Sequence, residues 1–165
     1  MTKIVPKVTT ALACRIVDLM RPRLDEAMLG GFLECLPKTT AGRPRVFLPD
    51  DLLALWYYRE LIGDGYTRET AGRIACAVAV TARKNPVAKT ISYVEHYHGS
   101  HLENTHSPLS EFAFPSDQVP DPSKWDDVSF SGSEIRKVTI FRVSLARKLI
   151  AERSAEEINT FGSED

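Results

Sequence analysis

The sequence predicts an α+β fold, with helices in its first half and strands in its second. Three observations lead to this prediction. Apolar residues recur at helical spacing up to about residue 84, a basic segment with turn residues interrupts them, and two later segments alternate apolar with polar residues. The chain has 165 residues, 43% of them hydrophobic, so it is long enough to bury a core.

Two short helices are expected at the start of the chain. The first is capped by Thr9 or Thr10 and runs to about Met20. Arg21-Pro22-Arg23 interrupts it, because proline disfavours helix at the residue before it and lacks a backbone donor. The second helix runs from about Leu24 to Phe32. Two helices separated by a tight break have the shape of a helix-turn-helix.

A basic hairpin is expected after these helices, between Leu36 and Phe47. Thr39 to Gly42 form its turn, and Pro44 confines the second arm to an edge strand or a wing. The segment contains no acidic residue and three basic ones, which are Lys38, Arg43 and Arg45.

Two longer helices follow the hairpin. Leu48 to Asp51 open the third helix, with a proline in its first turn and aspartates where the helix dipole favours negative charge. Gly63-Asp64-Gly65 stops it. Thr67 then caps a fourth helix from Arg68 to about Ala82, and Asn85-Pro86 closes this unit. The third helix contains three consecutive aromatic residues, Trp56, Tyr57 and Tyr58. They point in different directions on a helix, so core packing explains them better than base stacking does.

The sequence of the second half predicts a small unit with the order strand, loop, strand and helix. Thr90 to His98 and Ile135 to Val143 are the strands, and the proline-containing interval from Gly99 to Glu134 is an acidic loop. A final helix runs from Leu145 to about Glu152, and residues after Ser154 are expected to fray.

These elements divide into a winged helix-turn-helix head over residues 8–84, a strand-loop-strand-helix part over 87–155, and a disordered tail over 156–165. Charge differs between the parts. Residues 1–45 hold eight Lys/Arg against four Asp/Glu, a local net of +4, whereas residues 95–134 hold eight acids against one lysine, a local net of −7. One end of the molecule is therefore suited to approach a polyanion.

The order of these elements resembles the DNA-binding head of the MerR-like winged-helix regulators over about residues 8 to 83. Three features carry the likeness: an Arg-x-aromatic wing, an Asp-Leu helix start and a Gly-aromatic-Thr turn. They correspond to Arg45-Val46-Phe47, Pro49-Asp50-Asp51-Leu52 and Gly65-Tyr66-Thr67, and Leu61 and Ile74 belong to the same pattern. The chain looks like divergent forms found in alphaproteobacterial genomes and prophages. Two departures matter: Asn85-Pro86 ends the fourth helix early, and paired cysteines for metal sensing are missing, so metal or drug sensing is not transferred.

The resemblance implies a homodimeric transcription regulator that binds double-stranded DNA. The second helix would enter the major groove and the wing would contact the backbone. Asp25 and Glu26 would repel phosphate if they faced DNA, although a carboxylate can accept a hydrogen bond from cytosine. Arg15 joins the site only if it lies on the exposed face of the first helix. The expected DNA-binding residues are Arg15, Arg21, Arg23, Lys38, Thr39, Thr40, Arg43 and Arg45.

Other function classes receive less support. The sequence has no Gly-rich phosphate loop, no Gly-x-Ser-x-Gly and no His-Glu-x-x-His, so no enzyme activity, catalytic residue or cofactor is predicted. Two alternatives stay open: a protein-interaction adaptor or antirepressor with a protein partner, and a small phage DNA-packaging or recombination accessory protein.

The histidines and cysteines predict no metal site. All four histidines (His96, His98, His101 and His106) lie within eleven residues, and packed or exposed histidines are favoured over a zinc site or a pH-sensitive interface. Cys14, Cys35 and Cys76 have no CxxC spacing and are interpreted as buried reduced thiols. With neither a secretion signal nor an apolar run long enough for a bilayer, the expected location is the cytoplasm.

Overall fold

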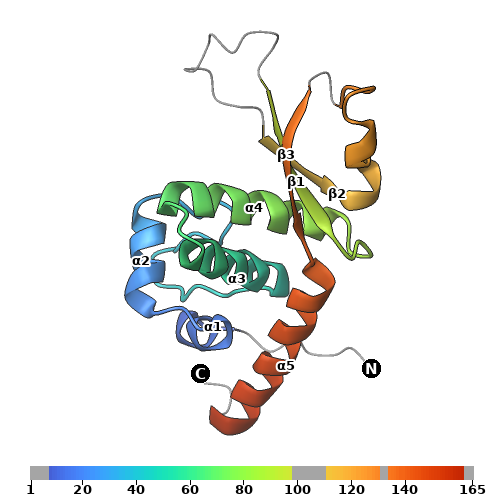
Figure 1. Cartoon of the computed structure of the whole chain (residues 1–165). Helices are drawn as coiled ribbons and strands as arrows, with labels where there is room; N and C mark the ends of the chain where they lie inside the picture. Colours follow the sequence, from blue (N-terminus) through green and yellow to red (C-terminus); the bar gives the residue numbers. More distant parts are fainter. Residues whose placement is uncertain (1–7, 98–110, 131–133, 162–165) are drawn as a thin grey trace.

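A computed structural model describes residues 8–97, 111–130 and 134–161, and it has the predicted α+β composition (Figure 1). Helices α1 to α4 precede a three-stranded sheet, and α5 follows it. Two short 3₁₀ turns, η1 and η2, lie between the second and third strands. The elements are α1 (Thr10–Val17), α2 (Arg21–Leu29), α3 (Pro49–Gly63), α4 (Arg68–Lys84), β1 (Ile91–His96), β2 (Glu111–Pro115), η1 (Ser116–Gln118), η2 (Pro122–Lys124), β3 (Ile135–Phe141) and α5 (Val143–Phe161).

The first two helices form, but their boundary differs from the prediction. Thr9 caps α1, since its hydroxyl accepts the N–H of Leu12 at 3.4 Å. The helix ends at Val17 because Asp18 adopts a left-handed conformation with φ 58°. Pro22 begins α2 instead of interrupting a helix, because a first-turn position needs no backbone donor.

The basic hairpin forms as a small two-armed loop over residues 38–47, here called the hairpin. Thr40 and Arg43 pair across the Ala41-Gly42 turn, and Gly42 has the positive φ of 78° that favours glycine. The second arm ends at Phe47, whose N–H donates to the carbonyl of Val8 at 2.9 Å. The predicted turn at 39–42 is therefore confirmed, and the hairpin is held beside α1.

Helices α3 and α4 pack against each other at the centre of the molecule (Figure 1). Residues 51–58 of α3 are buried throughout, including the three consecutive aromatic residues that were expected to pack in the core. The matching face of α4 is small, which allows close approach, and consists of the buried residues Ala71, Ala75, Ala79 and Ala82.

The sheet is antiparallel, with β1 between β2 and β3. Strand β2 was not expected, because Glu111–Pro115 lies within the interval 99–134 that was interpreted as a loop. Its five residues pair with β1, and Phe112 and Phe114 lie on the same face of the sheet. Residues 98–110, which belong to the same predicted loop, lie outside the described part of the chain.

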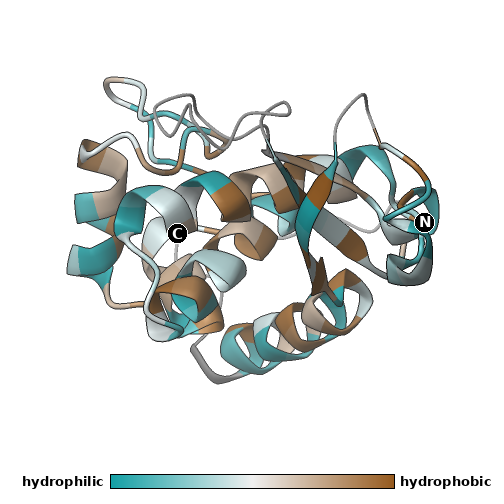
Figure 2. Cartoon of the chain, turned by 45° about the horizontal axis from the view of Figure 1, so that its top comes forward, coloured by the Kyte–Doolittle hydropathy of each residue, from teal (hydrophilic) through white to brown (hydrophobic). Residues whose placement is uncertain are grey.

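Helix α5 runs past the point where a disordered tail was expected. It continues to Phe161, and its hydrophobic and hydrophilic residues alternate along the helix (Figure 2). It packs against α1 and α3, so Ile150 belongs to the same core cluster as Ile16 and Leu55. Ile91 and Phe141 of the sheet also belong to that cluster. The predicted boundary at residues 84–87 thus does not separate two cores.

Candidate nucleic-acid interface

The hairpin lies beside α2, and two open grooves run along it. One groove of about 790 Å³ lies between the hairpin and α2, and another of about 510 Å³ faces the start of α1. Asp25, Thr39 and Arg45 line both grooves and therefore form the ridge between them. We call the residues around this ridge the α2–hairpin surface, which consists of Arg21, Lys38, Thr39, Thr40, Arg43 and Arg45.

The hairpin holds Arg45 in place while it leaves its other cations in solvent. The Arg45 guanidinium donates to the Thr39 hydroxyl at 2.6 Å and so links the two arms. Arg45 is half-buried, whereas Lys38 and Arg43 are exposed. Within the described residues, no hydrogen bond or ion pair engages the side chain of Lys38 or Arg43. These two charges are available to an anionic ligand.

Arg21 and Arg23 point to opposite sides of α2. Arg21 lines the groove beside the hairpin and is 3.5 Å from Asp25. Arg23 lines a different groove, with Tyr66 and Arg68 at the turn between α3 and α4. Helical residues two apart differ by about 200° in direction, so these arginines cannot share one surface. The structure places Arg21 next to the hairpin and Arg23 away from it.

Arg15 faces the C-terminal helix. Its guanidinium is 3.4 Å from the Glu157 carboxylate of α5, and its side chain is 33% exposed. The condition on which it was included, a place on the exposed face of α1, is not met. We therefore leave Arg15 outside the α2–hairpin surface.

The two acidic residues of α2 each have a cationic partner. Asp25 is paired with Arg21, and Glu26 with Arg68 from the first turn of α4. Partial neutralisation of this kind lowers the repulsion that an approaching phosphate would experience. The sequence showed the acids, but the partner from α4 lies 42 residues along the chain and was not predicted.

Of the four histidines, His96 is the one that lies within the described residues. His96 is 1% exposed on β1, and its ring centroid lies 6.4 Å from that of Phe112 and 6.2 Å from that of Phe130. Among the residues that the structure describes, no group of three His, Cys, Asp or Glu side chains is placed to hold a metal ion. His98, His101 and His106 lie outside the described residues.

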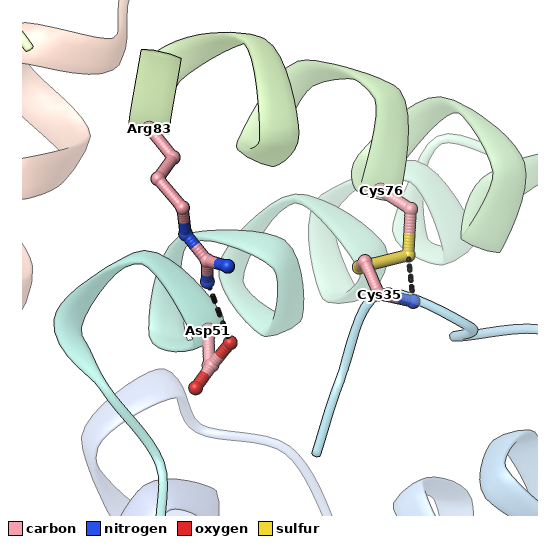
Figure 3. Close-up of a disulfide and its surroundings, with 4 residues drawn as sticks. All are labelled: Cys35, Asp51, Cys76 and Arg83. Carbon is pink, nitrogen blue, oxygen red and sulfur yellow. Dashed lines mark hydrogen bonds and ion pairs between the residues drawn. A yellow bond between two sulfur atoms is a disulfide. The ribbon is translucent and has the colours of Figure 1, made fainter. Parts of the chain in front are cut away.

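Two of the three cysteines differ from the prediction. Cys35, between α2 and the hairpin, and Cys76 of α4 form a disulfide with a Cα–Cα distance of 5.5 Å (Figure 3). Only Cys14 is a buried thiol, and burial raises its pKa. The pair was missed because 41 residues separate the cysteines, and no local spacing signals that the chain brings them together.

Comparisons with known proteins add no assignment, since no protein-family model and no curated protein match this chain. Across the described ranges, every helix is too short or too polar to be a candidate for crossing a bilayer.

Proposed function

We propose that this chain is a transcription regulator that binds double-stranded DNA through the α2–hairpin surface. The observation that carries the proposal is the convergence of α2 and a glycine-turned basic hairpin on one open surface. Arg21, Lys38 and Arg45 line its grooves, and Arg43 is exposed on the same hairpin. Double-stranded DNA is a regular polyanion, and most protein contacts to it go to phosphates. A protruding basic loop beside a short helix is the arrangement that winged helix-turn-helix proteins use.

The role that we propose for each residue follows from how exposed its side chain is. Lys38 and Arg43, which are exposed, neutralise phosphates, and the hydroxyls of Thr39 and Thr40 donate hydrogen bonds to the same backbone. Arg45 keeps the two arms of the hairpin together through Thr39. Arg21, at the start of α2, is the residue of this set that can reach a base edge or a phosphate at the major groove.

The proposal includes a cytoplasmic homodimer. A single short helix reads only a few base pairs, and two heads related by a two-fold axis read two half-sites. The part of the chain after residue 87 supplies the contacts between the two copies in this proposal.

The decisive experiment measures duplex binding at several salt concentrations. A variant with Lys38→Ala and Arg43→Ala removes two phosphate contacts, so it should bind every duplex more weakly and lower the slope of log K against log [salt] by about two. The matched control carries Arg23→Ala and Lys84→Ala, which remove the same two charge types from exposed positions that lie outside the surface and before residue 87. Fluorescence anisotropy with fragments selected from genomic DNA gives both affinity and target.

Two results would contradict the proposal. One is an absence of duplex binding by the unaltered protein at low salt. The other is an equal loss of affinity in the control variant, which would indicate attraction by overall charge and no defined surface.

A protein-interaction module is the second candidate, and exposed apolar side chains on the two outer strands of the sheet favour it. Phe112 of β2 is 52% exposed and Ile140 of β3 is 64% exposed, and the strand register places both on the same face. Exposed apolar side chains that gather on one face often mark a protein contact. A stable complex with a protein partner, combined with no affinity for DNA, would select this candidate.

A further inference from the structure

The disulfide joins a segment that leads into the proposed DNA-binding surface to a helix that lies outside that surface. Cys35 lies in the linker of residues 30–37 that leads from α2 to the hairpin, and Cys76 lies in the third turn of α4. The backbone N–H of Cys35 also donates to the Cys76 sulfur at 3.4 Å (Figure 3). Their Cα–Cα distance of 5.5 Å is within the usual range for a disulfide.

The linker rests directly on α4 around this bond. Leu33 and Leu36 are 2% and 3% exposed, so each side of Cys35 is anchored in the core. Gly72 of α4 leaves no room for a side chain against the carbonyl oxygen of Phe32. These contacts do not involve the sulfur atoms, so the linker should stay on α4 after reduction while it loses its covalent hold.

Beyond Cys35, the linker continues into the α2–hairpin surface. Glu34 and Leu36 line the same open groove as Lys38, Thr39 and Arg45. The position of the linker on α4 therefore sets where the hairpin stands relative to α2. A covalent bond at Cys35 fixes that position more tightly than side-chain packing alone.

Solvent reaches the bond from one side. Cys76 lines an open groove of about 380 Å³ between the linker and α4, together with Glu34, Glu69 and Arg73. Both cysteines are half-buried, whereas Cys14 is 7% exposed and its raised thiol pKa makes it a poor nucleophile. A small thiol or disulfide can thus approach the Cys76 sulfur while Cys14 stays protected.

We propose that Cys35 and Cys76 are a reversible redox pair that controls the α2–hairpin surface, with the disulfide form preorganised for DNA and the dithiol form less so. This inference rests on the proposed function for its biological consequence. Its structural content, tightening of the hairpin by oxidation, can be tested without DNA. Disulfides that form and break in response to a cell's redox state act as sensors in reducing compartments.

The exchange partner is a low-molecular-weight disulfide of the glutathione class. The Cys76 thiolate attacks one sulfur of that disulfide, a mixed disulfide forms, and the first small thiolate leaves. The Cys35 thiolate then attacks the Cys76 sulfur, the protein disulfide forms, and the second small thiolate leaves. Two electrons pass from the protein to the reagent, and the two protons lost by the cysteines appear on the two released thiols.

The first experiment follows the cysteines themselves. The protein is equilibrated in glutathione buffers of different potential, and alkylation with mass spectrometry reports each thiol. Cys35 and Cys76 should change state together, and Cys14 should stay unreactive. The Cys35→Ser variant should form the mixed disulfide at Cys76 faster than Cys76→Ser forms it at Cys35. Equal rates, or a pair that stays oxidised under strongly reducing conditions, would overturn the reversible site.

The second experiment follows the hairpin by amide hydrogen exchange. Reduction of the unaltered protein should speed exchange in residues 36–47, and a Cys35→Ser, Cys76→Ser double variant should show the fast rates whatever the redox buffer. A Cys14→Ser variant, as a control, should keep the response. Unchanged exchange after reduction would overturn the coupling of the disulfide to the hairpin.

Duplex affinity then connects the two proposals. The oxidised protein should bind DNA at least about fivefold more tightly than the reduced protein, in the range of ordinary allosteric coupling. Equal affinities of the two forms would overturn control of DNA binding. If neither form binds a duplex while hydrogen exchange still responds to reduction, the proposed function fails and the redox control of the surface stands.

Discussion

Asp51 is a buried carboxylate that joins the start of α3 to the end of α4. It is 3% exposed, and it accepts the N–H of Leu48 at 2.8 Å and a guanidinium N–H of Arg83 at 3.0 Å (Figure 3). The first contact satisfies a donor that the helix N-terminus leaves without a partner. The sequence predicted an acidic first turn at this position but not the arginine that meets it.

Replacement of Asp51 tests how much this contact stabilises the fold. Asp51→Ala removes the acceptor for the Leu48 N–H and leaves Arg83 without its buried partner, so the free energy of unfolding should fall by roughly 1–3 kcal/mol. Urea denaturation measures the change. Asp50→Ala is the control: its ion pairs are longer, at 3.6 and 3.8 Å, and its loss should cost under about 1 kcal/mol. Equal losses for the two variants would contradict this account.

The aromatic residues of α3 show why three consecutive large rings can all be buried. Trp56 lies beneath the guanidinium groups of Arg59 and Arg153, at 5.0 and 5.2 Å from its ring centroid. Tyr57 packs edge-to-face on Phe141 of β3 at 4.9 Å, and burial raises its pKa. The rings therefore contact different elements, as their directions on the helix predicted, and α5 covers one of them.

At the scale of elements, α5 packs against the rest of the protein with its last turns as well as its first. Arg153 donates to the carbonyl oxygen of Ile16 at 3.2 Å and lies over Trp56. Glu157 is paired with Arg15, and Ile158 packs against the core. The contacts of Glu157 and Ile158 come from positions where a frayed end was expected. The expectation was wrong because local sequence does not show that α1 and α3 offer a surface to this segment.

Truncation after Glu152 tests this role of α5. Removal of residues 153–165 takes away a cation–π contact, a hydrogen bond, an ion pair and buried apolar area, so the free energy of unfolding should fall by roughly 2–4 kcal/mol. Thermal or urea unfolding of the two chains measures it. Glu156→Ala, an exposed position on the same helix, should leave stability unchanged. Equal stability of the truncated and full chains would mean that the segment behaves as a loose tail.

The elements that could be predicted from sequence are those that local chemistry decides. Thr9 and Thr67 cap helices, Gly42 supplies a turn with positive φ, and the alternation of Ile91 to His96 makes a strand. Strand β2 was missed because five residues between prolines carry too little periodicity, and only pairing with β1 stabilises it as a strand. The correct predictions concerned neighbours in sequence, and most failures concerned a distant partner; the early end of α1 at Asp18 is a local exception.

The same rule applies to the candidate site at the scale of the whole molecule. The hairpin cations were identified from sequence because they lie within eight residues of one another. The positions of Arg15 and Arg23 away from the hairpin, and the disulfide, could not be predicted, because their surroundings come from α5, from the α3–α4 turn and from α4. The hydrophobic core that joins both halves fixes those surroundings, and no local pattern reports it.

The disulfide is also a covalent link between two segments that lie far apart in the sequence, and its removal should lower stability. A bond that closes a loop of 41 residues restricts the unfolded chain, which corresponds to about 2–4 kcal/mol. The Cys35→Ser, Cys76→Ser double variant should therefore unfold roughly 5–15 °C lower. Its urea m-value should rise, because the unfolded chain without the cross-link is less compact and exposes more surface. Reductant should lower the midpoint of the unaltered protein and leave the double variant unaffected; equal midpoints with and without reductant would show that the bond does not constrain the unfolded chain.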